Sequence, residues 1–82
     1  HLHARDDDAV HKARQCARLL AALQNSPVST IDARDRLNIY HAPARVHQLR
    51  KQGHKIATRM RTELDVYGRP HRVGVYILGG AE

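Results

Sequence analysis

The sequence predicts a small α+β domain in which three helices are followed by a β-hairpin. Apolar residues recur at helical spacing through the first half of the chain, whereas they alternate with period two from His54 onward. Turn-forming residues, above all Pro27, Gly53 and Gly68, separate the periodic segments. The 82 residues are enough for one domain and leave no room for a second.

The composition narrows the class of protein further. A chain of this size buries about 60–65% of its unfolded surface, so a deep substrate cavity would compete with the core for apolar residues. No apolar run approaches the roughly 20 residues of a membrane helix, and the chain does not open with a secretory signal pattern. We therefore expect neither a membrane protein nor a secreted precursor. The single cysteine, Cys16, excludes an internal disulfide and fits a reducing, intracellular compartment.

The first predicted helix covers residues 9–24. Four apolar residues in it fall at i, i+3, i+4 and i+7, which makes one stripe at helical spacing: Cys16, Leu19, Leu20 and Leu23. The acidic run 6–8 precedes the helix and suits its positive N-terminus, and the run 25–27 ends it at a proline. Because the chain begins without Met, we expect a cut or processed piece whose residues 1–8 form a flexible lead.

The second predicted helix is short and covers residues 31–37, after a brief extended connector at Val28. Ser29 and Asp32 have the spacing of a capping box, in which a side chain and a backbone amide satisfy each other at a helix start. A tight turn over residues 38–41 follows. Asn38 tolerates the left-handed conformation that such a turn requires.

The third predicted helix starts at Pro43, runs to about Gln52 and is stopped by Gly53. On a helical wheel one side is apolar and is formed by Ala42, Val46 and Leu49. The opposite side carries Ala44, His47, Gln48 and Lys51, while Arg45 and Arg50 lie on the two flanks. Nothing in the packing of a helix demands polar residues on that opposite side, which makes it a candidate binding face.

Two strands are predicted after the third helix. In the first, residues 55–61, Ile56, Thr58 and Met60 alternate with basic residues, and a turn-rich segment over 65–70 links it to the second strand, residues 72–78. Both faces of the second strand are apolar, although one face of such a hairpin usually meets water. A homodimer formed through this sheet is therefore a further expectation, and residues 79–82 are a tail beyond the domain, residues 9–78.

The charge is concentrated in one half of the chain. The net charge is +6, of which residues 1–40 carry +1 and residues 41–82 carry +5. Between residues 41 and 61 there are six basic side chains and no acidic one. Such a positive field favours a polyanionic partner, with nucleic acid the first candidate.

Two short helices joined by a tight turn, the second one lined by polar residues, describe a helix-turn-helix, and the hairpin makes it a winged version. The third helix, residues 43–52, fits the major groove of double-stranded DNA, and the hairpin, residues 55–78, reaches the phosphate backbone. The predicted contacts all lie on these two elements. They are Ala44, Arg45, His47, Gln48, Arg50, Lys51, Lys55, Arg59, Arg61, Arg69 and Arg72.

A family resemblance supports this reading. From Leu19 to Leu78 the chain resembles the winged helix-turn-helix domains of small phage- and prophage-encoded bacterial proteins. The most specific stretch reads R-V-x-x-L-R-x-x-G-x-x-I from Arg45 to Ile56. The resemblance implies DNA binding and a role in transcription regulation or another phage DNA transaction, in the cytoplasm or at the nucleoid. One departure is Asn38, where such sequences commonly have glycine.

Several alternatives stay open at this stage. Arg45 and Arg50 have an equally good use in pairing with Asp32 or Asp35, and Tyr40 is expected in the core. The rival function is a winged-helix docking module within a larger assembly. The sequence offers no catalytic set and no metal-ligand spacing, so we expect no enzyme, no cofactor, no metal and no small-molecule substrate.

Overall fold

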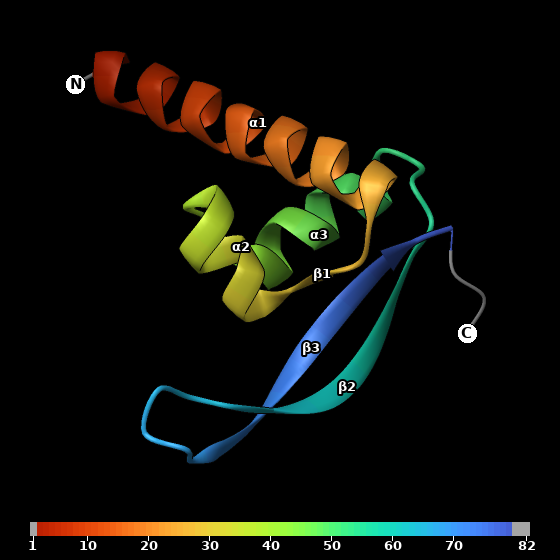
Figure 1. The fold of residues 1–82 in the computed structure, drawn as a ribbon. Coiled ribbons are helices and arrows are strands. Elements are labelled where there is room, and N and C mark those ends of the chain that lie inside the picture. Colours follow the sequence, from red (N-terminus) through yellow and green to blue (C-terminus); the bar gives the residue numbers. More distant parts are fainter. Residues whose placement is uncertain (1, 80–82) are drawn as a thin grey trace.

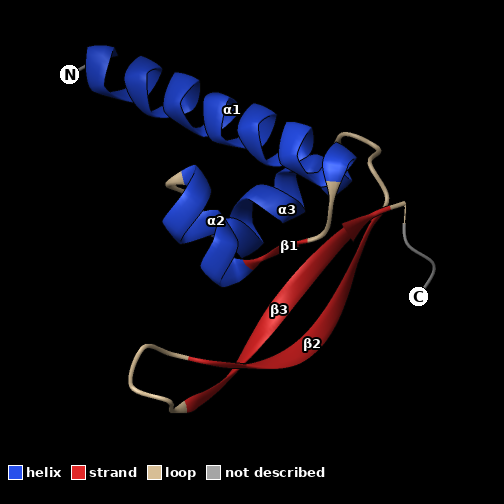
Figure 2. Cartoon of the chain, in the orientation of Figure 1, coloured by secondary structure: helices blue, strands red, loops and turns tan. Residues whose placement is uncertain are grey.

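The computed structural model describes the backbone of residues 2–79 and the side chains of residues 9–79. Three helices and three strands follow in the order α1–β1–α2–α3–β2–β3 (Figure 1). The strands form one antiparallel sheet in the order β1–β3–β2, and the β2–β3 hairpin extends away from the helices (Figure 2). This is the predicted α+β arrangement: three helices and a C-terminal hairpin wing.

Helix α1 spans Leu2–Asn25 and ends where the proline was expected to end it. Its start differs from the prediction, because the backbone is helical from Leu2 and not from Ala9. The acidic run 6–8 therefore lies inside the helix and does not cap it, and the lead expected over residues 1–8 is helical apart from His1, which lies outside the described residues.

The connector after α1 is a strand. Residues Val28–Ser29 form β1, which pairs antiparallel with β3 so that Val28 lies opposite Tyr76 and Ser29 opposite Val75. The sequence predicted an extended segment here but not its pairing. A two-residue strand has no periodicity of its own, so only the partner strand defines it.

Helix α2, Thr30–Leu37, begins with the predicted capping box. The Asp32 amide donates to Ser29 Oγ at 2.9 Å, and the Asp32 carboxylate accepts from the Ser29 amide at 3.4 Å. The helix ends at Asn38, whose φ of 57° and ψ of 43° are left-handed, as expected for the residue that stands in place of glycine.

Helix α3, Ala42–Lys51, is bounded within one residue of the prediction. Gly53 has a φ of +100°, and its amide donates to the carbonyl of Arg50 at 3.0 Å. The next amide, that of His54, donates to the carbonyl of Leu49 at 3.1 Å. These two bonds form a Schellman motif, which satisfies the last carbonyls of the helix and turns the chain into the hairpin.

Strands β2, Ile56–Leu64, and β3, Pro70–Leu78, pair over their full length, from Ile56 opposite Leu78 to Leu64 opposite Pro70. A five-residue loop, 65–69, joins them. At the other end of the hairpin the Gly79 amide donates to the carbonyl of Lys55 at 2.7 Å. The rest of the predicted tail, residues 80–82, lies outside the described residues.

The core lies between the helices and the sheet and is aliphatic, as a chain without Trp or Phe requires. Its largest fully buried apolar side chains are Leu19 on α1, Val46 and Leu49 on α3, and Ile39 in the turn before α3. Tyr76 of β3 joins them, and burial raises the pKa of its hydroxyl. Within the described part of the chain no helix is long and apolar enough to cross a bilayer.

Candidate nucleic-acid interface

The solvent face of α3 is the centre of the candidate site. Its apolar side packs on the core through Ala42, Val46 and Leu49, which are at most 1% exposed. The opposite side is exposed and carries Ala44, His47 and Lys51, and Arg50 is exposed on one flank. Packing of the apolar side fixes the direction of the opposite one, so the predicted binding face does project from the domain.

Gln48 was predicted on this face but lies at its edge. The side chain is half-buried on the flank that meets α1, where Cys16 Sγ lies 3.5 Å from Gln48 Oε1. Cys16 itself is 6% exposed and belongs to the core, as the apolar stripe predicted. His47 and Lys51 are therefore the exposed polar side chains nearest the middle of the face.

Arg45 was predicted to contact DNA, but its side chain is buried. It is 8% exposed, and its Nε is buried without a hydrogen-bond partner. The alternative pairing of Arg45 with Asp32 or Asp35 is not found among the described residues. Asp32 takes part in the capping box of α2, and Asp35 pairs with Arg34 at 3.2 Å. On a wheel Arg45 lies on a flank of α3, and only the packing against α1 decides that this flank is covered.

Arg50 has a role that the sequence did not indicate. Its Nε donates to the carbonyl of Ile56 at 3.0 Å, and its Nη2 donates to the same carbonyl and to Thr58 Oγ1 at 2.9 Å. Of the two uses left open for Arg50, pairing with an aspartate of α2 is not the one found here, since the guanidinium bonds to β2. The guanidinium joins the last turn of α3 to the first residues of β2 and holds the wing against the helix.

The wing carries the remaining predicted cations. Lys55, Arg59, Arg61, Arg69 and Arg72 are all exposed. The pairing register puts Arg59 opposite Val75 and Arg61 opposite Val73, on the other side of the sheet from Thr58 and Tyr76. This confirms the predicted alternation. Arg61 forms an ion pair with Glu63, so part of its charge is neutralised within the wing.

The loop at the end of the wing is organised by one carboxylate. Asp65 Oδ1 accepts hydrogen bonds from the amides of Tyr67 and Arg69, each at 2.9 Å, and Asp65 Oδ2 lies 2.7 Å from His71 Nε2. The bond to His71 is the main cause that lowers the pKa of Asp65, followed by the bond from the Arg69 amide. Gly68, with a φ of +78°, completes the turn.

Two exposed features near the site escaped the sequence reading. Tyr40 was expected in the core but is 68% exposed beside the N-terminus of α3, because its neighbour Ile39 takes the buried position. At the tip of the wing Leu64, Val66 and Tyr67 are also exposed. The signal for the second feature was present, since these apolar residues fall at the turn of the predicted hairpin.

The outer face of the sheet differs from the surface that the homodimer expectation assumed. Val73 and Val75 are each 6% exposed and Ala57 is 2% exposed in the single chain. These side chains are covered already, so they do not form an open apolar face for a second copy.

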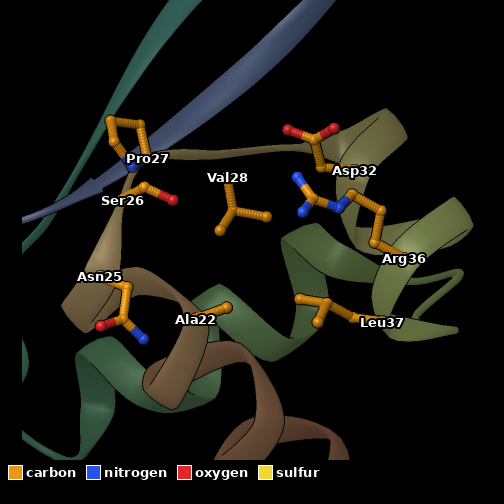
Figure 3. Close-up of a pocket in the computed structure, with 8 residues that line it drawn as sticks. All are labelled: Ala22, Asn25, Ser26, Pro27, Val28, Asp32, Arg36 and Leu37. Carbon is orange, nitrogen blue, oxygen red and sulfur yellow. The ribbon is translucent and has the colours of Figure 1, made fainter.

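A pocket of about 310 Å³ lies on another part of the surface, between the end of α1, β1 and α2 (Figure 3). Val28 and Leu37 supply apolar walls, and Asp32 and Arg36 of α2 line the pocket as well. None of its lining residues belongs to α3 or to the hairpin. Among the described residues no group of three or more His, Cys, Asp or Glu side chains could hold a metal ion.

Helices α2 and α3 joined by a left-handed residue, with a basic hairpin tied to the second helix, define a winged helix-turn-helix, which is a DNA-binding fold. Comparison with protein families agrees, because the model of the winged helix-turn-helix domain matches residues 14–81. The chain belongs to this family. Searches against curated proteins and against solved structures find no match.

Proposed function

We propose that this domain, residues 9–78, binds double-stranded DNA in a sequence-specific manner and regulates transcription of a phage or other mobile element. The observation that carries the proposal is the pairing of an exposed helix face with a cationic wing. Arg50 links the two through its bonds to the carbonyl of Ile56 and to Thr58. A reading element and a backbone-binding element linked in this way suit a duplex, in which the groove and the phosphates lie side by side.

The side chains on α3 have the chemistry for reading base edges in the major groove. Lys51 can donate to guanine O6 and N7, Gln48 can pair with adenine, and Ala44 can contact the methyl group of thymine. His47 offers one donor and one acceptor when neutral. Tyr40 is exposed beside the same end of α3, within the turn, and we add it to the proposed contacts.

The cations of the wing are proposed to bind phosphates. Lys55, Arg59, Arg69 and Arg72 are exposed on the hairpin, and each phosphate contact adds affinity that weakens with salt. Arg61 is expected to contribute less to phosphate binding, because its ion pair with Glu63 neutralises part of its charge. Arg45 is left out of the proposed interface, since its side chain is buried.

Selection of bound fragments from random duplex DNA tests the proposal. We expect one enriched sequence, with a dissociation constant that rises steeply between 50 mM and 200 mM salt. An empty selection at low salt would contradict the proposal and favour the docking module. Binding of a protein partner through an apolar surface would change little over the same range of salt.

Two finer points belong to the same proposal. A palindromic site in the selection would require two copies of the domain, and light scattering on the complex would count them. The homodimer through the sheet that the sequence led us to expect stays a proposal, with Val73 and Val75 already covered in the single chain. We also propose that the protein acts in the cytoplasm, the location that the single cysteine led us to expect.

A further inference from the structure

The outer edge of β2 is exposed along the wing. β2 is the last strand of the sheet, and no other strand of the described chain lies beside its outer edge. The strand has nine residues, contains no proline, and pairs with β3 without a bulge from Ile56 to Leu64. Figure 2 shows that most of it extends away from the helices. A long, regular edge of this kind presents amides and carbonyls that can pair with another strand.

Every second residue of β2 directs its amide and carbonyl toward this edge. The Lys55 carbonyl accepts from the Gly79 amide and therefore faces the side of β3. The next carbonyl, that of Ile56, accepts from Arg50 and faces away from β3. Because these directions alternate along an antiparallel strand, the further outward residues are Thr58, Met60, Thr62 and Leu64. Arg50 also covers the start of the edge, since it reaches Thr58 Oγ1, which leaves residues 60–64 as the open part.

The charges of this part of the wing cancel, which indicates a partner other than DNA. Residues 61–71 contain two arginines and two acidic residues, so their formal net charge is zero with histidine neutral. Met60 is 55% exposed and Leu64 is 69% exposed, and both lie on the opposite face of β2 from Arg61 and Glu63. A partner that fits this edge is a protein strand with both charges on one face and apolar side chains on the other.

A second copy of β2 is such a strand. In an antiparallel pair centred on Thr62, the two Thr62 residues lie opposite each other, and Met60 lies opposite Leu64 of the second copy. Arg61 lies opposite Glu63 of the second copy, and the same contact occurs again on the other side of the axis. These charged residues occupy non-hydrogen-bonded positions, where side chains approach most closely. Opposite charges and apolar pairs in such positions stabilise a sheet.

The pattern also selects this register over its neighbours. A pair centred on Arg61 would put the two Arg61 side chains opposite each other, and a pair centred on Glu63 would do the same with the two carboxylates. Like charges directly opposite each other destabilise strand pairing. The register centred on Thr62 avoids both contacts, and it joins the outward amides and carbonyls of one copy to those of the other.

We propose that two copies of this domain pair antiparallel through residues 60–64 of β2, about an axis at Thr62, and so join their sheets into one. The contact lies at the edge of the sheet, so it does not need the covered side chains of Val73 and Val75. It uses no residue of α3. The pairing requires no DNA, and it stands or falls separately from the proposed function.

Sedimentation equilibrium without DNA tests the pairing. Five residues per copy make a small and therefore weak interface, so the apparent mass of the wild-type protein should rise from one copy toward two between about 10 μM and about 1 mM. Arg61→Glu and Glu63→Arg each place like charges opposite each other, so each variant alone should stay monomeric. An equal mixture of the two variants places Glu opposite Arg at both positions, and it should dimerise again.

Two more variants complete the design. Arg14→Glu makes the same change in net charge as Arg61→Glu at an exposed position of α1, and it should dimerise like the wild-type protein. Thr62→Pro removes an amide that points away from β3, so it should keep the hairpin and abolish the dimer. Circular dichroism checks the fold of each variant.

Three results would overturn the inference. The first is a wild-type protein that stays monomeric up to about 1 mM. The second is dimerisation of Arg61→Glu, Glu63→Arg or Thr62→Pro alone to the wild-type extent, which would place the contact elsewhere. The third is a mixture of the two charge variants that stays monomeric, because the register centred on Thr62 requires that this mixture pairs.

Discussion

Replacing Arg50 tests whether its guanidinium ties the wing to α3 or contacts phosphate. Arg50→Met keeps the aliphatic stem and removes the donors to the carbonyl of Ile56 and to Thr58 Oγ1. Hydrogen bonds from a charged donor contribute about 1.5–3 kcal/mol in favourable cases. Because the side chain of Arg50 is exposed, we expect a smaller loss, about 1–2 kcal/mol in the free energy of unfolding.

For a domain of this size, each kcal/mol shifts the melting temperature by about 4–8 °C. Arg50→Met should therefore lower the Tm by roughly 5–15 °C in differential scanning calorimetry. The matched control is Lys51→Met, which makes a similar change at the next residue, on the exposed face. Its Tm should stay close to that of the wild-type protein.

The salt dependence of DNA binding provides the second readout. A lost phosphate contact would reduce the logarithmic slope by about 0.9, whereas loss of a tie within the protein should leave the slope nearly unchanged. If Arg50→Met kept the wild-type Tm and reduced the slope by about one unit, the guanidinium would be a phosphate ligand and the tie would be refuted.

Three further predictions concern the cap, the wing loop and the backbone contacts. Ser29→Ala removes the cap of α2 and should cost about 1 kcal/mol in urea unfolding; no change would argue against the capping box. The pKa of Asp65 is lowered in the folded state, so its contribution to stability is present above its usual pKa of 3.8 and is lost as the pH falls through the lowered value. Exchange of the Arg69 amide should therefore speed up in strong acid, and Asp65→Asn, with its weaker acceptor, should show faster exchange already near neutral pH; equal exchange in both proteins would contradict this. Arg69→Ala should weaken binding to all duplexes alike and reduce the salt slope by about one unit; a loss confined to one sequence would contradict a phosphate contact.

The sequence predicted the helices well because each carries a local signal. The apolar stripe, the capping box at Ser29 and the glycine stop at Gly53 involve residues that are close in the chain, so their outcome depends little on the rest of the fold. The start of α1 was wrong for a related reason. Asp6–Asp8 suit a helix N-terminus but are also tolerated within a helix, so their presence does not fix the boundary.

The candidate site was harder to predict, because burial on a flank depends on the neighbouring element. Arg45 and Arg50 lie on the two flanks of the same helix, yet Arg45 is covered and Arg50 bonds to β2. A helical wheel predicts the same exposure for both flanks. Ile39 and Tyr40 show the same limit, since adjacent residues in a turn compete for one core position and only the packed structure selects Ile39.

The central claim, that α3 reads DNA, is tested most directly by His47→Ala on two duplexes. His47 is exposed on the face opposite the core, so the substitution should leave the fold intact. Fluorescence anisotropy on the selected duplex should show a loss of about 1–3 kcal/mol, or roughly 5- to 150-fold in affinity, with little change on a scrambled duplex of the same length. Equal loss on both duplexes, or no loss on either, would contradict α3 as the reading helix.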